Sequence, residues 1–374
     1  MDIKTILKSY FGYDSFRANQ EEIINTTLHQ QDCLVLMPTG GGKSICYQIP
    51  AIAMQGTAVI ISPLISLMKD QVESLKVNGI EAAALNSGNS FSTDTIIRRK
   101  CLDGTLKLLY ISPEKLLNEI PLLLKQMTIS MFAIDEAHCI SQWGHDFRPE
   151  YTQLDILHQE FPEVPIIALT ATADKITRQD IIKQLKLKNP RVFISSFDRP
   201  NLNLTVKRGY STKEKDNYLL NFIKARPLES GIVYCLSRKT TEKVAKHLKE
   251  KGIRCDVYHA GLSQQDRDKA QLNFQKDDVQ VICATIAFGM GIDKSNVRWV
   301  IHYNMPKSIE SFYQEIGRAG RDGAPADTVL FYSLADVVQL SLFAKESGQM
   351  EINQDKLRQM QNYAESNICR RRIL

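Results

Sequence analysis

The segment MPTGGGKS, residues 37–44, combines three glycines with a lysine and a serine, which are residue types that bind phosphate groups. It follows the apolar run CLVLM and precedes ICYQIPAIAM, so we expect it at a turn from a strand into a helix. Backbone N–H groups and a helix N-terminus meet at such a turn and favour an anion. The predicted nucleotide ligands are Thr39, Gly40, Gly41, Gly42, Lys43 and Ser44. Lys43 is expected to neutralise the β- and γ-phosphates, and Ser44 to ligate magnesium.

Two adjacent carboxylates, Asp135 and Glu136, follow another apolar run, MFAI. Because neighbouring residues of a strand alternate in direction, the two side chains are predicted to project to opposite sides. Asp135 is expected to hold magnesium through water, and Glu136 to orient and deprotonate an attacking water. Alone, an Asp-Glu pair is usually a solvated strand end, and MPTGGGKS alone could be a glycine-rich turn with an unrelated lysine and serine. Together they favour hydrolysis of a nucleotide.

Positive charge for a transition state is available in SFYQEIGRAGRDG, residues 311–323, through Gln314, Arg318 and Arg321. Arginines three apart lie on one face of a helix. An arginine finger supplied from a second domain would make hydrolysis depend on domain closure. The alternative for this segment by itself is a basic exposed helix that ends at a glycine. The glycine-rich segment 284–300 follows a strand-like run and is a further candidate for lining the same cleft.

The elements that must position these residues are indicated by short apolar runs that alternate with helical stretches, as in parallel α/β sheets covered on both faces. The runs are CLVLM, AVIIS, LKLLYIS, MFAID and PIIALT, followed later by GIVYCLS, DVYHAG, QVICAT, VRWVIHYN and TVLFYSL. The pattern lapses at SSFDRPNLNL, residues 195–204. We therefore expect two α/β domains joined near residues 198–208, with a helical tail from Asp336 onward.

The composition is that of a globular chain with a mild positive charge. The 374 residues carry a net charge of +5, which permits an anionic partner without requiring one. No run approaches the ~18 apolar residues of a membrane span, so we expect no membrane association and a cytoplasmic location. The eight cysteines show no C-x-x-C pair, and several lie in apolar runs. They are interpreted as buried, reduced thiols.

The order of the motifs resembles that of the superfamily 2 helicases, and more narrowly the RecQ family of DNA helicases. The resemblance extends from about residue 5 to the C-terminus. The segments that carry it are FGYDSFRANQ (11–20), MPTGGGKS (37–44), SPLISLMKDQ (62–71), DEAHCISQWGHDFRPEY (135–151), LTATA (169–173), SSFDRPNL (195–202), YHAGL (258–262), ATIAFGMGI (284–292) and QEIGRAGRDG (314–323).

The resemblance implies two RecA-like parallel-sheet domains in tandem, with an ATP cleft between them and a short helical C-terminal tail. The expected boundaries are residues 1–200, 201–335 and 336–374. Its implied ligands are ATP and Mg²⁺, with adenine held by Tyr13, Arg17 and Gln20. Thr170 to Thr172 would relay the nucleotide state. Arg321 is the expected finger, supported by Arg318 and Gln314.

In this family the stretch after the acidic pair is an aromatic-rich loop that contacts single-stranded DNA. The residues expected to bind DNA are Trp143, His145, Phe147 and Arg148. Bases stack on aromatic rings at ~1 to 3 kcal/mol each regardless of sequence, and the arginine can contact phosphate or a ring. His138 and His145 are expected to connect this loop to the catalytic acids through hydrogen bonds.

Met37 stands where the strict G-x-x-x-x-G-K-S motif has its first glycine, which matches a helicase-type variant rather than a kinase P-loop. Two positions depart from the family pattern. Asp293 stands where many members carry asparagine. Family members commonly continue from the CRR sequence into three further cysteines, whereas this sequence has Cys369 alone. One thiolate does not form a structural zinc site, so we predict no zinc.

The expected function is that of an ATP-dependent DNA helicase core, which couples hydrolysis to 3'-5' movement on single-stranded DNA and to duplex unwinding in recombination and repair. Its expected partners are single-stranded and partly duplex DNA. We expect a monomer, associated with the nucleoid if the source is bacterial. Two alternatives remain open. One is an RNA helicase of the same superfamily, and the other is a nucleotide-gated single-strand-binding clamp with little turnover.

Overall fold

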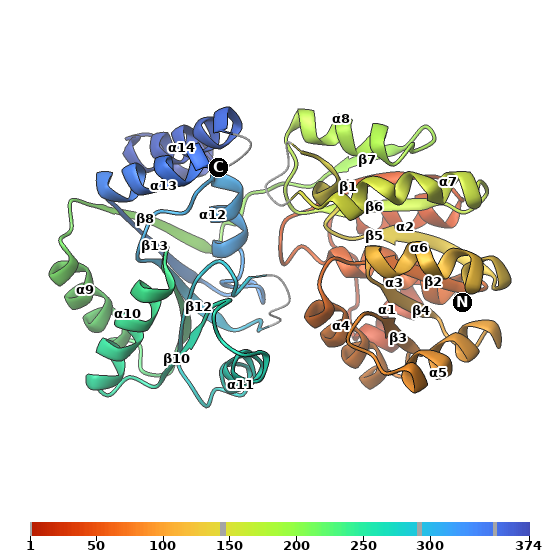
Figure 1. Ribbon diagram of the computed structural model, residues 1–374, viewed down its shortest axis with the longest axis horizontal. Coiled ribbons are helices and arrows are strands. Elements are labelled where there is room, and N and C mark those ends of the chain that lie inside the picture. The colour runs from red at the N-terminus through yellow and green to blue at the C-terminus, as the bar shows by residue number, and fades with distance from the viewer. Residues whose placement is uncertain (1, 143–146, 290–293, 347–349) are drawn as a thin grey trace. The chain divides into compact units, whose positions relative to one another are not determined.

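The computed structural model describes residues 2–142, 147–289, 294–346 and 350–374 (Figure 1). The chain divides into two compact units, Met1–Ser196 and Phe197–Leu374. Each unit contains its own parallel β-sheet covered by helices, so the expected tandem of parallel-sheet α/β domains is confirmed. The division lies at 196/197, close to the boundary expected at 200/201. The helices after residue 335 belong to the second unit.

The first unit is built on a seven-stranded sheet with the order β3-β4-β2-β5-β6-β1-β7, in which every pair is parallel. Its strands are β1 (Cys33–Leu36), β2 (Thr57–Ile61), β3 (Ala82–Leu85), β4 (Leu108–Ile111), β5 (Ile129–Ile134), β6 (Ile166–Thr170) and β7 (Arg191–Ile194). The central strands are buried along their whole length, which is why they are continuous apolar runs in the sequence.

The helices of the first unit connect these parallel strands, except for α1 and α2, which precede β1. They are α1 (Ile3–Phe11), α2 (Gln20–Leu28), α3 (Lys43–Ala53), α4 (Ile65–Val77), α5 (Phe91–Leu102), α6 (Pro113–Leu122), α7 (Ile156–Glu160) and α8 (Lys175–Gln184), with the short 3-10 helices η1 (Leu124–Gln126), η2 (Ala137–Ile140) and η3 (Pro149–Asp155). Side chains of α3 and α4, including Tyr47 and Met68, pack on alternate strand residues such as Val35 and Ile60. This layer fixes the turn between β1 and α3 against the sheet.

The second unit contains a six-stranded parallel sheet with the order β10-β11-β9-β12-β13-β8. Its strands are β8 (Leu202–Arg208), β9 (Ser230–Tyr234), β10 (Cys255–Tyr258), β11 (Val281–Ala284), β12 (Val297–His302) and β13 (Ala326–Tyr332). Gly231 of β9 lies against the indole of Trp299, where an added Cβ would be only 2.0 Å from a ring atom. Any larger residue at Gly231 would displace that buried indole.

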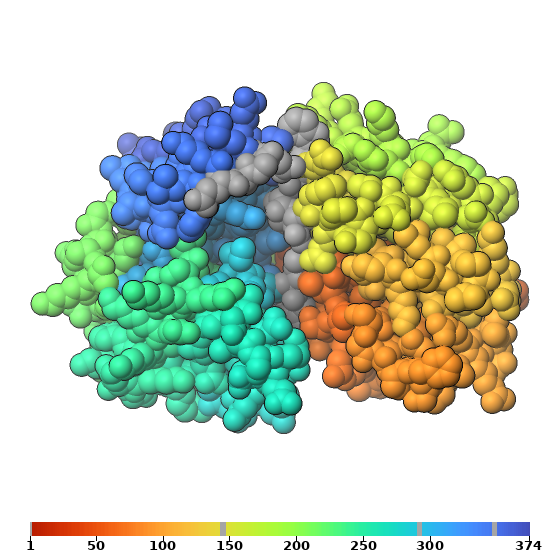
Figure 2. All heavy atoms as spheres, viewed as in Figure 1, coloured from red at the N-terminus to blue at the C-terminus, as the bar shows by residue number. Residues whose placement is uncertain are grey.

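Helices cover both faces of the second sheet. They are α9 (Thr212–Lys224), α10 (Arg238–Glu250), α11 (Gln264–Gln275), α12 (Ile309–Ile316), α13 (Leu334–Glu346) and α14 (Met350–Glu365), followed by the 3-10 helix η4 (Arg370–Arg372). Side chains of α9 and α10 share one core with Trp299, and those of α11, α12 and α14 share another with Phe288. The predicted helical tail is confirmed as α13 and α14, which form part of the surface of this unit in blue in Figure 2.

Three strands were not anticipated from the sequence: β3, β7 and β8. Strand β3 reads AAAL, and alanine has little preference for strands. Strand β7 is an edge strand that reads RVFI, and its apolar run is only three residues long, with Val192 and Ile194 exposed. Strand β8 lies at the other sheet's edge and begins at Leu202, inside the segment that was expected to be a linker. The strands that sequence patterns miss are therefore those with weak burial or weak propensity.

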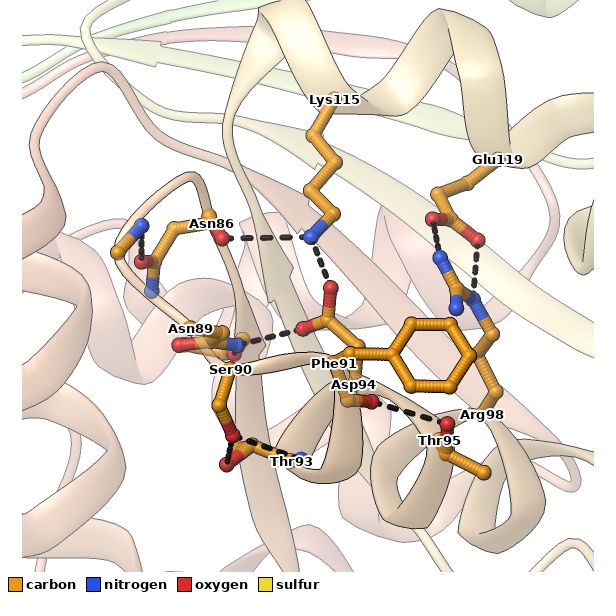
Figure 3. Close-up of polar contacts among 12 residues, drawn as sticks. Asn86, Asn89, Ser90, Phe91, Thr93, Asp94, Thr95, Arg98, Lys115 and Glu119 are labelled. Carbon is orange, nitrogen blue, oxygen red and sulfur yellow. Dashed lines mark hydrogen bonds and ion pairs between the residues drawn. The ribbon is translucent and has the colours of Figure 1, made fainter.

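Two ion pairs join α5 to α6 in the first unit (Figure 3). Lys115 contacts the carboxylate of Asp94, which also accepts a hydrogen bond from Asn89 at 2.9 Å. Arg98 forms a two-pronged contact with Glu119, which is 1% exposed. Burial raises the pKa of Asp94, but the hydrogen bonds from Lys115 and Asn89 outweigh it and lower the pKa overall.

Other predictions concern cysteines and membranes. Seven of the eight cysteines are buried and all are free thiols, as expected, and Cys369 is exposed. Within the described parts of the chain, no helix has the length and apolarity needed to cross a bilayer.

Candidate active site

The segment predicted to bind phosphate lies at the turn from β1 into α3, as the sequence indicated. Gly40 and Gly42 have φ values of +79° and +83°, in the left-handed region that favours glycine. Gly42 is the N-cap residue of α3, and an added Cβ there would be 2.5 Å from Nε2 of Gln20. The glycines therefore permit both the sharp turn and the close approach of a neighbouring side chain. The turn delivers the N-terminus of α3 to the strand end, where an anion is favoured.

Lys43 and Ser44 are the first two residues of α3. The Lys43 ammonium donates hydrogen bonds to the carbonyl oxygens of Met37 at 3.1 Å and Pro38 at 3.5 Å, so it lies over its own turn. Tyr47, one helical turn after Ser44, is buried, and its hydroxyl oxygen is 3.4 Å from that of Tyr110 on β4. The first turn of α3 therefore lies next to a pair of buried phenol groups.

The residues predicted to hold adenine contact this turn from the segment before α2. Arg17 donates from Nη1 to the carbonyl of Gly40 at 2.7 Å. The Gln20 side chain is buried, accepts from the backbone N–H of Arg17 at 2.8 Å, and donates to the carbonyl of Gly42 at 3.1 Å. Tyr13 is 54% exposed. Arg17 and Gln20 are therefore parts of the same small structure as the glycine turn.

Asp135 and Glu136 lie just beyond β5, which ends at Ile134. The prediction that strand alternation would set their directions is wrong in its premise, since neither residue is on the strand. Glu136 instead adopts φ +49°, a left-handed conformation that is uncommon outside glycine. Its backbone N–H donates to Oδ1 of Asp135 at 3.0 Å. The turn itself aims the two carboxylates.

The electrostatics of the acidic pair favour a bound cation. Burial, and next the neighbouring Glu136 carboxylate, raise the pKa of Asp135, while the Lys43 ammonium and the Glu136 N–H oppose that rise. Two hard carboxylates and the Ser44 hydroxyl are the oxygen donors that Mg²⁺ accepts, with water and phosphate completing its shell. A divalent cation here would relieve the repulsion that raises the pKa, so the residues fit magnesium.

Thr170, the last residue of β6, connects the two halves of this site, because β6 lies between β5 and β1 in the sheet. Its carbonyl accepts from the backbone N–H of Met37 at 3.1 Å. Its hydroxyl is 2.9 Å from Nδ1 of the fully buried His138, which is also 3.3 Å from a Glu136 carboxylate oxygen. The Thr170 hydroxyl donates to the carbonyl of Thr172 at 3.1 Å, so we infer that His138 Nδ1 carries the proton and donates it.

Tyr151, for which no role was predicted, connects the end of the aromatic-rich motif to the acidic pair. Tyr151, in η3, is fully buried and donates its hydroxyl proton to the carbonyl of Asp135 at 3.0 Å. Its position at the end of the motif DFRPEY was the only sequence signal. Arg148 donates to the carbonyl of Pro63 at 2.9 Å, and its N–H donates to the carbonyl of Cys139 at 2.8 Å.

The residues predicted to bind DNA are only partly covered by the structure. Phe147 and Arg148 are half-buried. Trp143 and His145 lie outside the described residues, as does Asp293.

The arginines of the second unit differ in their surroundings. Arg318 follows α12 and is 6% exposed. Arg321 is half-buried, three residues further on, and Gln314 is a half-buried residue of α12. The buried position suits Arg318 for support, and the more exposed position suits Arg321 for contact with a ligand.

No group of three or more His, Cys, Asp or Glu side chains suited to a metal occurs in the described residues.

Comparisons with known proteins agree with this geometry. Residues 17–181 match the DEAD/DEAH box helicase family, and residues 214–323 match the helicase conserved C-terminal domain. The chain is 53% identical over 374 residues to a protein of Haemophilus influenzae named ATP-dependent DNA helicase RecQ, covering 99% of this chain and 60% of that protein. The protein of the same name from Bacillus subtilis is 44% identical over 377 residues, covering 99% of this chain and 63% of that protein.

The chain belongs to the RecQ helicase family. It spans about 60% of the length of the RecQ relatives named above. Among solved structures, it resembles Mss116p bound to single-stranded RNA and AMP-PNP, with a TM-score of 0.74 and 19% identity, covering 93% of this chain and 76% of that one. At that identity the likeness shows the RecA-like helicase fold alone.

Proposed function

We propose that this RecQ-family chain is an ATP-hydrolysing motor core that moves along single-stranded DNA and separates duplex DNA. The observation that carries the proposal is the continuous set of contacts from the glycine turn, through Thr170 and His138, to Glu136, with Tyr151 joining the aromatic-rich loop to Asp135. Through these contacts, a change at the phosphate site would alter the polymer-binding loop, and strand binding would alter the acidic pair. The names of the RecQ relatives, which specify an ATP-dependent DNA helicase, support the choice of substrates.

Each residue has a distinct task in the proposed reaction. The turn at 39–44 and Lys43 bind the phosphates, while Tyr13, Arg17 and Gln20 hold the base. Mg²⁺, when bound by Ser44 and Asp135, would neutralise phosphate charge. Glu136 orients the attacking water and accepts its proton, and His138 lies beside that carboxylate, with Nδ1 3.3 Å from Oε2.

The second unit supplies positive charge to the transition state in this proposal. Arg321 is the finger, and Arg318 and Gln314 support it. A finger contributes ~10³- to 10⁵-fold in related nucleotide hydrolases. Hydrolysis then becomes dependent on how the two units move, which converts chemistry into stepping.

The DNA contact in the proposal is made by Trp143, His145, Phe147 and Arg148. Stacking on aromatic rings is independent of sequence, which suits a motor that must pass every base. We further propose 3'-5' movement, action as a monomer, and a role in recombination and repair, on the basis of the family resemblance.

Steady-state phosphate release tests the assignment of substrate. The wild-type chain is compared with Glu136→Gln, in the presence of single-stranded DNA or single-stranded RNA of the same length. We expect turnover to require Glu136 and to be stimulated more by DNA than by RNA. Greater stimulation by RNA would identify an RNA helicase. Strand binding that depends on ATP, with no turnover above that of Glu136→Gln, would identify a nucleotide-gated clamp.

A further inference from the structure

We propose that Arg371 is a positioning residue for Arg321. Arg371 holds the segment 198–202, and this segment holds the loop 317–323 that carries Arg321. The inference rests on the proposed function for Arg321 and adds to it a mechanical support from the C-terminal residues. All of the contacts described below lie within the second unit.

The segment 198–202 holds the loop by its backbone carbonyls. Arg199 donates from Nη2 to the carbonyls of Ala319 and Gly320, both at 2.9 Å. Asn201 donates from Nδ2 to the carbonyls of Gly320 and Ala324, also at 2.9 Å. Two side chains thus grip the backbone on both sides of Arg321. A loop held at its carbonyls has a fixed path, so the direction of its intervening side chain is constrained.

The central residue of this grip has to be glycine. Gly320 has φ +57°, and an added Cβ would be 2.4 Å from Nδ2 of Asn201 and 2.7 Å from the carbonyl oxygen of Ala324. The N–H of Gly320 also donates to the carbonyl of Val297 at 2.9 Å, at the start of β12. The residue before Arg321 is therefore anchored to the sheet and to Asn201.

Arg371, in η4, holds the segment 198–202 in its turn. Its Nη1 donates to the Asp198 carboxylate at 2.8 Å and to the carbonyl of Arg199 at 2.7 Å. Its Nη2 donates to the carbonyls of Pro200 at 3.1 Å and Leu202 at 2.8 Å. One guanidinium thus binds four acceptors within five consecutive residues. A lysine cannot reproduce this planar arrangement of donors.

The contacts form one path. Arg371 binds the carbonyl of Arg199 and the carbonyls on either side of Asn201, and the side chains of Arg199 and Asn201 hold the loop that carries Arg321. The Arg371 side chain is 36% exposed and contributes little to the core, so its main effect is on the geometry of the segment 198–202. A misplacement of a catalytic group by about 1 Å can cost ~100-fold in rate. Loss of Arg371 leaves the direct grip of Arg199 and Asn201 in place, so we expect a smaller loss, on the order of 10-fold.

The test compares Arg371→Ala and Arg371→Lys with Arg372→Ala, whose exposed side chain is the matched control. We expect both Arg371 variants to lower kcat for ATP about 10-fold with KM unchanged, and to weaken binding of ADP with aluminium fluoride, a transition-state analogue, by a similar factor. Binding of ADP alone should be unchanged, and the melting temperature should fall but stay above the assay temperature, since several hydrogen bonds are lost. Arg372→Ala should behave as wild type. If Arg371→Ala lowers kcat no more than Arg372→Ala does, the proposal is wrong.

A double variant separates positioning from a general structural role. In an Arg321→Ala background, Arg371→Ala should cause no further loss of analogue binding, because both changes remove the same interaction. Losses that multiply would overturn the positioning role while leaving the finger intact. If Arg321→Ala itself leaves hydrolysis unchanged, the proposed function of the finger fails, which is a distinguishable result.

A second pair of variants tests the path if Arg371→Ala proves unstable. Asn201→Ala removes the hold on Gly320, whereas Asn203→Ala, two residues further on in β8, removes an exposed contact with Asp327 of the neighbouring strand β13. We expect Asn201→Ala to weaken the aluminium fluoride complex and Asn203→Ala to have no effect. Equal behaviour of the two would overturn the path.

Discussion

Replacement of Tyr151 by phenylalanine removes one hydroxyl and tests whether the aromatic-rich loop acts on the catalytic acids. The lost bond is the 3.0 Å contact with the carbonyl of Asp135, made by a fully buried ring. Phenylalanine fills the same space, so packing is retained. A neutral hydrogen bond is worth about 0.5 to 1.5 kcal/mol, and a buried carbonyl left without its partner costs about 1 to 3 kcal/mol. We therefore expect about 1 to 2 kcal/mol of coupling to be lost.

That energy corresponds to a 5- to 30-fold reduction, roughly, in the DNA-stimulated part of kcat. Basal turnover should stay within about 2-fold of wild type, since no group that contacts nucleotide changes. The assay is phosphate release over a range of single-stranded DNA concentrations. Tyr332→Phe is the matched control, because it removes a phenol bond to Glu365 in the second unit. If Tyr151→Phe and Tyr332→Phe show the same stimulation, or if basal and stimulated rates fall equally, the reasoning is wrong.

Three other changes follow from the site and the fold. Lys43→Ala should abolish hydrolysis while leaving the melting temperature near that of wild type, and substantial remaining turnover would refute its phosphate role. Phe147→Ala should retain basal hydrolysis but weaken single-stranded DNA binding by ~1 to 3 kcal/mol in a fluorescence titration; an equal loss of basal activity would mean that the ring is structural. Asp94→Asn should lower the free energy of unfolding by about 1 to 3 kcal/mol at pH 7, measured by urea titration. The folded-state pKa of Asp94 lies below its ordinary value of 3.8. The loss of stability should therefore be complete above pH 3.8 and should disappear as the pH falls through the lower folded-state pKa. A loss of stability that does not depend on pH would exclude the ion pair with Lys115 as its cause.

The buried strands were predictable because strands in the centre of a sheet have apolar sequences. Central strands such as β2 and β6 are covered on both faces, so they are apolar throughout, and the phosphate turn is recognisable between β1 and α3. Edge strands β7 and β8 have exposed residues and only short or interrupted apolar runs. Sequence patterns therefore located the central strands and β10, and missed the other edge strands, β3, β7 and β8.

Sequence motifs selected the candidate site residues but gave no information on the contacts that connect them. The contact between Tyr151 and Asp135 joins a 3-10 helix to a turn, and the side-chain direction of Glu136 depends on a left-handed backbone conformation. Neither follows from periodicity, since both depend on how irregular segments fold back on the sheet. The grip of Arg371 on residues 198–202 likewise joins positions that are far apart in the sequence. Motif recognition identifies such residues, and only the folded chain shows what holds them.

The most direct test of the account is ATP hydrolysis by this chain at saturating Mg²⁺ and ATP, with and without single-stranded DNA. The proposed coupling of the aromatic-rich loop to Asp135 and Glu136 predicts slow basal release of phosphate and at least a 10-fold stimulation by DNA, equivalent to ~1.4 kcal/mol. A rate that is the same with and without DNA would contradict the coupling. An absence of hydrolysis in both conditions would contradict the assignment of the acids themselves.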